Sequence, residues 1–255
     1  MKIIIDAMGG DHAPDQIVLG ALQSAKKYGV QIVLVGRGVE ILAAMKKHGV
    51  DTLPDGLEIA NAEDVVDMHV DPSKVVQQHR NSSIIVGLKM LAEGGGDAFI
   101  SAGNSGALLT GATLVTKRIR GIRRAAFAPI LPVGGGSILV DAGANSECTP
   151  ELLLQFGCMG SFYAEKALKL ERPRVALLNN GAEEGKGDAL HQEAYTLLKQ
   201  AGRRASSILS VTSRAATCPT VARMWWWPTV SPAMCSSRPW RAQPATCPSS
   251  SKRCL

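Results

Sequence analysis

The sequence Phe99-Ile100-Ser101-Ala102-Gly103-Asn104-Ser105-Gly106-Ala107-Leu108-Leu109 joins an apolar strand to a helix through a loop of small and hydroxyl residues. Glycines let the backbone of such a loop approach a ligand closely, and free N–H groups at the start of a helix attract anions. We therefore predict a phosphate-binding loop that uses Ser101, Gly103, Asn104, Ser105 and Gly106. The alternative interpretation is a tight strand-to-helix turn that binds no ligand.

Three other apolar runs also end in polar, glycine-containing loops. Because parallel strands open on the same edge of a sheet, we expect the four loops to converge there. For the first of the three, a turn followed by a helix N-cap is the alternative. The candidate site residues in these loops are Asp6, Gly9, Gly10 and Asp11 in the first, Asp141 and Asn145 in the second, and Asn180, Glu183 and Lys186 in the third.

Strand and helix patterns alternate along the first 202 residues. Continuous apolar runs such as Ile3–Ile5 are typical of parallel strands buried on both faces. Helical patterns follow them over residues 15–28, 39–48, 84–93, 152–168 and 189–200, and glycines close the first two. This alternation predicts an α/β fold with a doubly wound, mostly parallel sheet, and we assign residues 1–202 to one such domain.

The basic charge of the chain lies in its last fifth. The net charge is +6, but residues 203–255 contain no Asp or Glu and eight Lys or Arg. Residues 1–202 therefore carry a net charge of −2. Because the excess basic charge is confined to the tail, it does not indicate that the domain binds nucleic acid. All four Trp and four of the six Cys also lie in this tail, without the paired spacing of a zinc site.

The sequence predicts a cytoplasmic protein. We see no signal peptide at the N-terminus, and no apolar run approaches the roughly 20 residues that cross a bilayer. Cys148 and Cys158 have the pattern of reduced, buried cysteines.

Five cations fall within eight residues at the end of the helix that follows the opening loop. Such a cluster suits an acidic partner protein or a lipid surface, and the alternative is a solvated helix end. Its arginines, which we predict to bind the partner, are Arg118, Arg120, Arg123 and Arg124.

The motifs together resemble a known family. They are Asp6–Asp11, Asn81–Ser83, Ser101–Ala107, Asp141–Asn145 and Glu183–Gly187. In this order and spacing they are similar to the bacterial acyl-ACP:phosphate acyltransferases of phospholipid synthesis, the PlsX proteins. The resemblance covers about residues 1–202.

The resemblance implies a Rossmann-like sheet of the isopropylmalate-dehydrogenase type. It also implies a homodimer that transfers an acyl group from acyl carrier protein (ACP) to inorganic phosphate, possible peripheral attachment to the inner face of the membrane, and no cofactor or metal. Phosphate is itself the nucleophile, so the protein must hold it and stabilise an oxyanion. We assign charge neutralisation to Lys186, oxyanion donation to Asn145 or Asn180, and a base or orienting role to Glu183.

After residue 202 the resemblance stops. Met and Trp have single codons, and the DNA that encodes Met224-Trp225-Trp226-Trp227-Pro228 gives V-V-V-A, a segment of the family pattern, when it is read one base earlier. We therefore interpret residues 203–255 as a frame-shifted translation. A genuine basic, low-complexity tail is the alternative.

Two other functions remain open from the sequence. A nucleotide-dependent dehydrogenase would use a similar sheet, although no G-x-G-x-x-G follows the first strand. Alternatively, the altered tail leaves an inactive form of the acyltransferase.

Overall fold

The structure is a computed structural model that describes residues 1–131, 137–171, 173–179, 187–204, 210–212 and 221–224. The predictions for Asn180, Glu183 and Lys186 fall outside these residues, as does most of the tail.

The first half of the chain forms a four-stranded parallel sheet in the order β3-β2-β1-β4. Asp6 at the end of β1 pairs with Val35, and Ile5 pairs with Ile100 at the end of β4. The carboxyl ends of β1 and β4 are therefore neighbours. The strands are β1 (Lys2–Asp6), β2 (Gln31–Gly36), β3 (Leu57–Asn61) and β4 (Ala98–Ile100).

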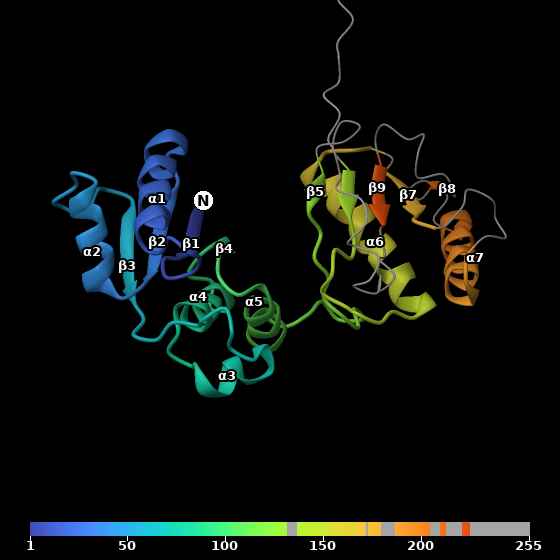
Figure 1. The fold of residues 1–255 in the computed structure, drawn as a ribbon. Coiled ribbons are helices and arrows are strands. Elements are labelled where there is room, and N and C mark those ends of the chain that lie inside the picture. The colour runs from blue at the N-terminus through green and yellow to red at the C-terminus, as the bar shows by residue number, and fades with distance from the viewer. Residues whose placement is uncertain (132–136, 172, 180–186, 205–209, 213–220, 225–255) are drawn as a thin grey trace, which may run out of the picture.

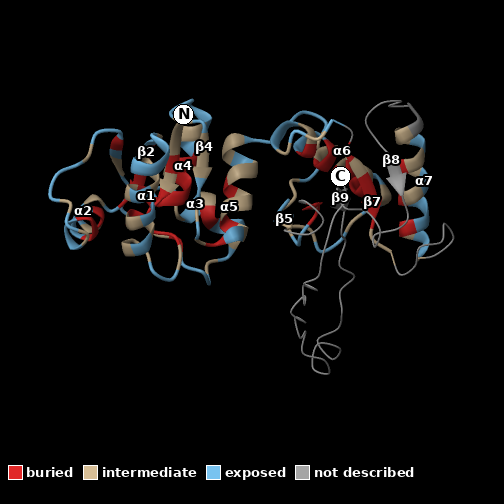
Figure 2. Ribbon diagram, turned by 90° about the horizontal axis from the view of Figure 1, so that it is seen from above, coloured by how far each residue is buried: buried red, intermediate tan, exposed pale blue. Residues whose placement is uncertain are grey.

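Helices cover both faces of this sheet, as the continuous apolar runs predict. Ile32 and Leu34 of β2 pack into one buried cluster with residues of α1 and α2. Val33 and Val35, which point the other way, pack with residues of α4. The doubly wound arrangement is confirmed for this half, and Figure 2 shows its buried residues between the layers.

The helices of this half agree closely with their predicted ranges. The helix predicted over residues 15–28 is observed there, and Gly29 closes it with a φ of 61° in the left-handed region. The helices are α1 (Asp15–Tyr28), α2 (Gly38–Lys47), α3 (Val75–Gln78), α4 (Ser83–Ala92) and α5 (Ser105–Gly111), with shorter turns η1 (Pro72–Lys74) and η2 (Ala112–Thr116).

The second half forms a separate five-stranded sheet in the order β5-β6-β9-β7-β8. Only the β5–β6 pair among these described strands is antiparallel. Phe156 and Leu153 of α6 and Leu198 of α7 pack against this sheet in one buried cluster. The elements are β5 (Ile130–Leu131), β6 (Ser137–Leu139), α6 (Pro150–Ala167), β7 (Arg174–Leu177), α7 (Ala189–Arg204), β8 (Ser210–Thr212) and β9 (Val221–Met224).

The expectation that four loops open on one sheet edge is wrong. The loops after β1 and β4 share the first sheet, whereas those after β6 and β7 belong to the second. Figure 1 shows the two sheets in separate halves, joined by the chain that follows α5. The apolar pattern of a strand indicates its burial but not its neighbours, so it could not distinguish one sheet from two.

Candidate active site

The loops after β1 and β4 are joined by one buried carboxylate. The Ser101 hydroxyl donates to Asp6 Oδ2 at 2.6 Å, and the Met8 N–H donates to Asp6 Oδ1 at 3.0 Å. Asp6 is 1% exposed. The Gly103 N–H donates to the Ser101 oxygen at 3.1 Å, which fixes the start of the loop. Asp6 therefore holds the two loops together, and both of its oxygens already accept hydrogen bonds from the protein.

Glycine is required where these loops touch. A Cβ on Gly9 would lie 2.6 Å from Asp6 Oδ2 and 2.7 Å from the Gly103 nitrogen. A Cβ on Gly103 would lie 3.2 Å from the Gly9 Cα. Gly10 adopts a φ of +104°, which L side chains rarely adopt. The predicted pairing of glycine loops at a sheet edge is thus observed for these two strands, and Asp11 lies exposed beside them.

Asn104 anchors the phosphate-loop candidate to a third segment. Its Oδ1 accepts from the Ala107 N–H at 3.0 Å, so it caps α5. Its Nδ2 lies 3.2–3.3 Å from the carbonyls of Asp67, Met68 and Val70. Both polar atoms of the Asn104 side chain, Oδ1 and Nδ2, therefore make hydrogen bonds within the protein.

Ser105 and Gly106 complete the loop. A Cβ on Gly106 would lie 2.7 Å from Pro72 Cγ, so the first turn of α5 packs closely on η1. Ser105 is exposed, and no hydrogen bond of its hydroxyl to another described residue is present. Of the three predicted side-chain donors, Ser105 is the one that remains open to a ligand.

A histidine–carboxylate pair lies near the start of α4. The sequence indicates that His79, with Arg80, suits a phosphate or acidic substrate or else a solvated helix end, but it does not indicate the pairing with Asp64. His79 Nδ1 lies 2.7 Å from Asp64 Oδ2. Ser82 caps α4, and its hydroxyl donates to the His79 carbonyl at 2.7 Å. Asp64 falls in an acidic stretch that has the appearance of a loop, and no regular spacing connects it to His79.

Asp141 and Asn145 form a second hydrogen-bonded cluster, in the loop after β6. Asp141 Oδ1 accepts from the backbone of Phe127 and Ala144, and Oδ2 accepts from the Asn145 N–H at 2.7 Å. Asn145 Nδ2 donates to Asp141 Oδ2 at 3.0 Å and to the Ala125 carbonyl at 2.9 Å. Both amide hydrogens of Asn145 are therefore in use, and its role as an oxyanion donor stays a prediction.

The four predicted partner-binding arginines all lie exposed after η2. Gln155 of α6 holds this segment, because its amide donates to the Gly121 carbonyl at 3.1 Å and accepts from the Arg123 N–H at 3.0 Å. Arg118 Nη1 also donates to the Arg123 carbonyl. These hydrogen bonds hold the segment in a defined turn, so it is not a frayed helix end.

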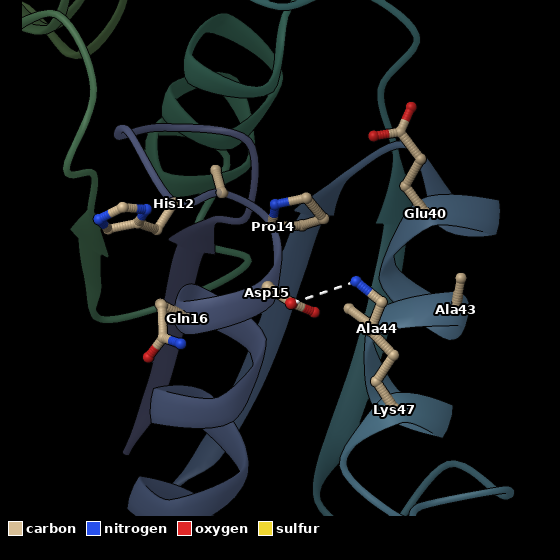
Figure 3. A pocket seen from close by; sticks show the side chains of 9 residues that line it. His12, Pro14, Asp15, Gln16, Glu40, Ala43, Ala44 and Lys47 are labelled. Carbon is tan, nitrogen blue, oxygen red and sulfur yellow. Dashed lines mark hydrogen bonds and ion pairs between the residues drawn. The ribbon is translucent and has the colours of Figure 1, made fainter.

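A cavity with a volume of about 780 Å³ lies between α1 and α2. Figure 3 shows Asp15 and Lys47 paired across it, at 3.2 Å. Its lining begins at His12, directly after the Gly9–Asp11 loop, and includes none of the predicted site residues.

Two further observations concern ligands and membranes. Among the described residues, no group of three or more His, Cys, Asp or Glu side chains could hold a metal ion. In the same part of the chain, no helix combines the length and apolarity needed to span a bilayer.

Asp188 and Cys158 are among the groups with shifted pKa values. The side-chain hydrogen bond with His191, whose Nδ1 lies 2.6 Å from Oδ1, lowers the pKa of Asp188. Burial raises the pKa of the Cys158 thiol, as expected of an unreactive cysteine.

Comparison with known proteins extends over most of the chain. The profile of a family described as "Fatty acid synthesis protein" matches residues 1–207. A phosphate acyltransferase from Alkaliphilus oremlandii is 47% identical over 201 residues, which cover 78% of this chain and 59% of that protein. Another from Herpetosiphon aurantiacus is 44% identical, covering 78% of this chain and 54% of that protein. The chain thus spans between half and three-fifths of the length of these relatives.

Solved structures support the fold. A phosphotransacetylase from Streptococcus pyogenes superposes with a TM-score of 0.63 at 14% identity, covering 88% of this chain and 76% of that one. The EutD phosphotransacetylase from Staphylococcus aureus gives 0.61 at 16% identity, covering 84% of this chain and 68% of that one. The Rossmann-like α/β class is confirmed. Since the family profile matches residues 1–207 and the relatives are phosphate acyltransferases, this chain belongs to the fatty acid synthesis protein family that the sequence motifs indicated.

Proposed function

We propose that this protein transfers a fatty acyl group from acyl-ACP to inorganic phosphate and so supplies acyl phosphate for phospholipid synthesis. The observation that carries the proposal is the pair of glycine loops locked by Asp6 and Ser101 beside the exposed start of α5. The names of the relatives support the same reaction. Nothing in the structure favours the dehydrogenase hypothesis over it.

The reaction needs a held phosphate and a stabilised oxyanion. A phosphate oxygen attacks the thioester carbonyl, the C–S bond then breaks, and ACP leaves as its thiol after taking up a proton. We assign phosphate binding to the hydroxyl of Ser105, which is exposed, and to the backbone N–H groups of Ser105 and Gly106 at the start of α5. Lys186 would neutralise phosphate charge, and Glu183 would orient Lys186 or act as a base. Asn180, or Asn145 on release of one of its two amide hydrogen bonds, would donate to the oxyanion.

The basic segment after η2 is the proposed docking surface for ACP. Arg118, Arg120, Arg123 and Arg124 are exposed, and Gln155 fixes the turn that presents them. An acidic carrier would be attracted to this charge, with a strong dependence on salt. A homodimer in the cytoplasm, with peripheral attachment to the membrane, completes the proposal.

We also propose that the tail, residues 203–255, is a frame-shifted segment. The matches to the relatives span 201 residues and the family profile ends at residue 207, which supports a change of reading frame near residue 203. Resequencing the gene across codons 195–210 tests this directly. An intact source frame that still encodes Trp225-Trp226-Trp227 would contradict it.

An acyl phosphate assay tests the function. The chain as given and a frame-restored chain are incubated with acyl-ACP and inorganic phosphate, and acyl phosphate is measured. The frame-restored chain is expected to form it, Lys186→Ala to lower the rate by orders of magnitude, and Ser105→Ala to raise the KM for phosphate. A frame-restored chain that folds but forms no acyl phosphate would rule the proposal out.

A further inference from the structure

A second, smaller cavity lies at the far end of the helix that starts at the phosphate-loop candidate. Its volume is about 210 Å³, and it lies between η2, the basic segment and α6. Its lining includes Ala112, Ile119, Ile122 and Met159, with Lys117 and Arg118 beside them. The cavity therefore combines apolar side chains with two cations, and none of the residues that line it is acidic.

This cavity is formed by a fixed turn. The Ile122 N–H donates to the Ile119 carbonyl at 3.0 Å, and Gln155 clamps the residues on either side of Ile122. On the opposite wall, Asn145 donates to the Ala125 carbonyl at 2.9 Å. Because these bonds hold the lining backbone, the cavity exists before any ligand enters it, which lowers the cost of ordering on binding.

The side chains that line the cavity favour one class of ligand. An apolar cavity favours a hydrocarbon chain, while exposed cations beside it favour an anionic head. Arg123 does not line the cavity. Lys117 and Arg118, which line the cavity themselves, are therefore the better partners for the head.

We infer that this cavity binds a single-chain anionic amphiphile, with its alkyl chain against Ile122 and Met159 and its head at Lys117 and Arg118. The site lies apart from the phosphate loop, because α5 and η2, of 7 and 5 residues, separate them by roughly 18 Å. It goes beyond the proposed phosphate binding, which uses the other end of this helix, and it shares Arg118 with the proposed ACP docking surface. Two sources share the required chemistry, namely the acyl phosphate product and free fatty acid.

Isothermal titration calorimetry of the full 255-residue chain with dodecyl phosphate, below its micelle concentration, tests the site. Ile122→Ser and Lys117→Glu are each expected to weaken binding about tenfold. Lys26→Glu makes the same charge change on the exposed end of α1 and should leave the affinity within about twofold. Circular dichroism of every variant establishes that it is folded, and Met159→Ser replaces Ile122→Ser if that variant unfolds.

Ligands that differ in alkyl chain length or in head group provide a second test. Each methylene that enters the cavity should strengthen binding up to about fourfold, so octyl phosphate should bind more tightly than butyl phosphate. Dodecyltrimethylammonium, with a cationic head, should bind far more weakly. Tighter binding of dodecyl phosphate than of laurate identifies the product as the source, and tighter binding of laurate identifies free fatty acid.

The inference is overturned if the folded Ile122→Ser and Lys117→Glu variants bind dodecyl phosphate as tightly as the unchanged chain. It is also overturned if the cationic amphiphile binds equally well. The two tests have different readouts, since the acyl phosphate assay measures turnover with acyl-ACP and calorimetry measures binding of the amphiphile to this cavity. The two proposals can therefore fail separately.

Discussion

The hydroxyl of Ser101 donates a 2.6 Å hydrogen bond to Oδ2 of Asp6, across 95 residues of sequence. Asp6 is only 1% exposed, so this bond satisfies a carboxylate that water barely reaches. Two loops of the candidate site are thus held at a fixed separation by one pair of side chains.

Replacing Ser101 should therefore destabilise the protein. We expect Ser101→Ala to lower the free energy of unfolding by about 1.5–3 kcal/mol, because a buried charged acceptor loses its donor. Urea denaturation measures the change. Ser105→Ala is the matched control, since Ser105 is exposed, and it should change stability by less than about 0.5 kcal/mol. Equal losses in the two variants would contradict the importance of the Asp6 bond.

Two glycine substitutions should change the stability of the protein in opposite directions. Gly9→Ala places a Cβ 2.6 Å from Asp6 Oδ2 and should destabilise the protein by about 1–3 kcal/mol. Gly20→Ala, in α1, meets no atom within 4 Å and should stabilise it by about 0.5–1 kcal/mol. Thermal unfolding of both variants tests the pair. The prediction fails if Gly9→Ala melts at or above the temperature of the unchanged protein.

Lys117 has a strained backbone that glycine would relieve. Its φ of 67° and ψ of 167° fall in a region that is occupied essentially by glycine alone. We expect Lys117→Gly to stabilise the protein by about 1 kcal/mol, even though it removes a charge. Lys26→Gly, inside α1, should instead cost about 1 kcal/mol. Urea denaturation compares them, and a loss of stability in Lys117→Gly would argue against the strain.

Asp188 should make stability depend on pH. Its hydrogen bond with His191 lowers the folded-state pKa below the ordinary value of 3.8. The folded protein then binds fewer protons than the unfolded chain, so the contribution is full above about pH 4 and is lost as the pH falls through the folded pKa. The stability difference between the unchanged protein and Asp188→Asn, measured by urea denaturation from pH 2 to 6, should shrink in acid. In a His191→Gln background the pH dependence should be smaller, and an unchanged pH dependence would contradict this cause.

The sequence predicted local structure well. The helix Asp15–Tyr28 combines an amphipathic pattern with a closing glycine, and both features act within a few residues of each other. The glycine loops at Gly9 and Gly103 were likewise recognisable as places where backbones approach closely. These predictions succeed because they depend on residues that are close together in the sequence, or on glycine, which is needed where two backbones come close.

Contacts between distant segments could not be predicted in the same way. Nothing in the pattern around Asn104 indicates that its amide reaches the carbonyls of Asp67, Met68 and Val70. The pairing of His79 with Asp64 depends on how an irregular segment returns past α4. Such contacts follow from tertiary packing, which one sequence does not encode in any regular spacing.

The strand order of the second sheet has a consequence for synthesis of the chain. β9, at Val221–Met224, lies between β6 and β7 and begins beyond residue 207, where the family match ends. The first sheet is complete at Ile100. If the reading frame changes near codon 203, a ribosome has by then supplied every strand of the first sheet, so that half can fold while the chain is still being made. The altered residues then reach the middle of the second sheet. The groups that we propose to bind phosphate at the start of α5 then lie in the half that the change of frame leaves unaltered.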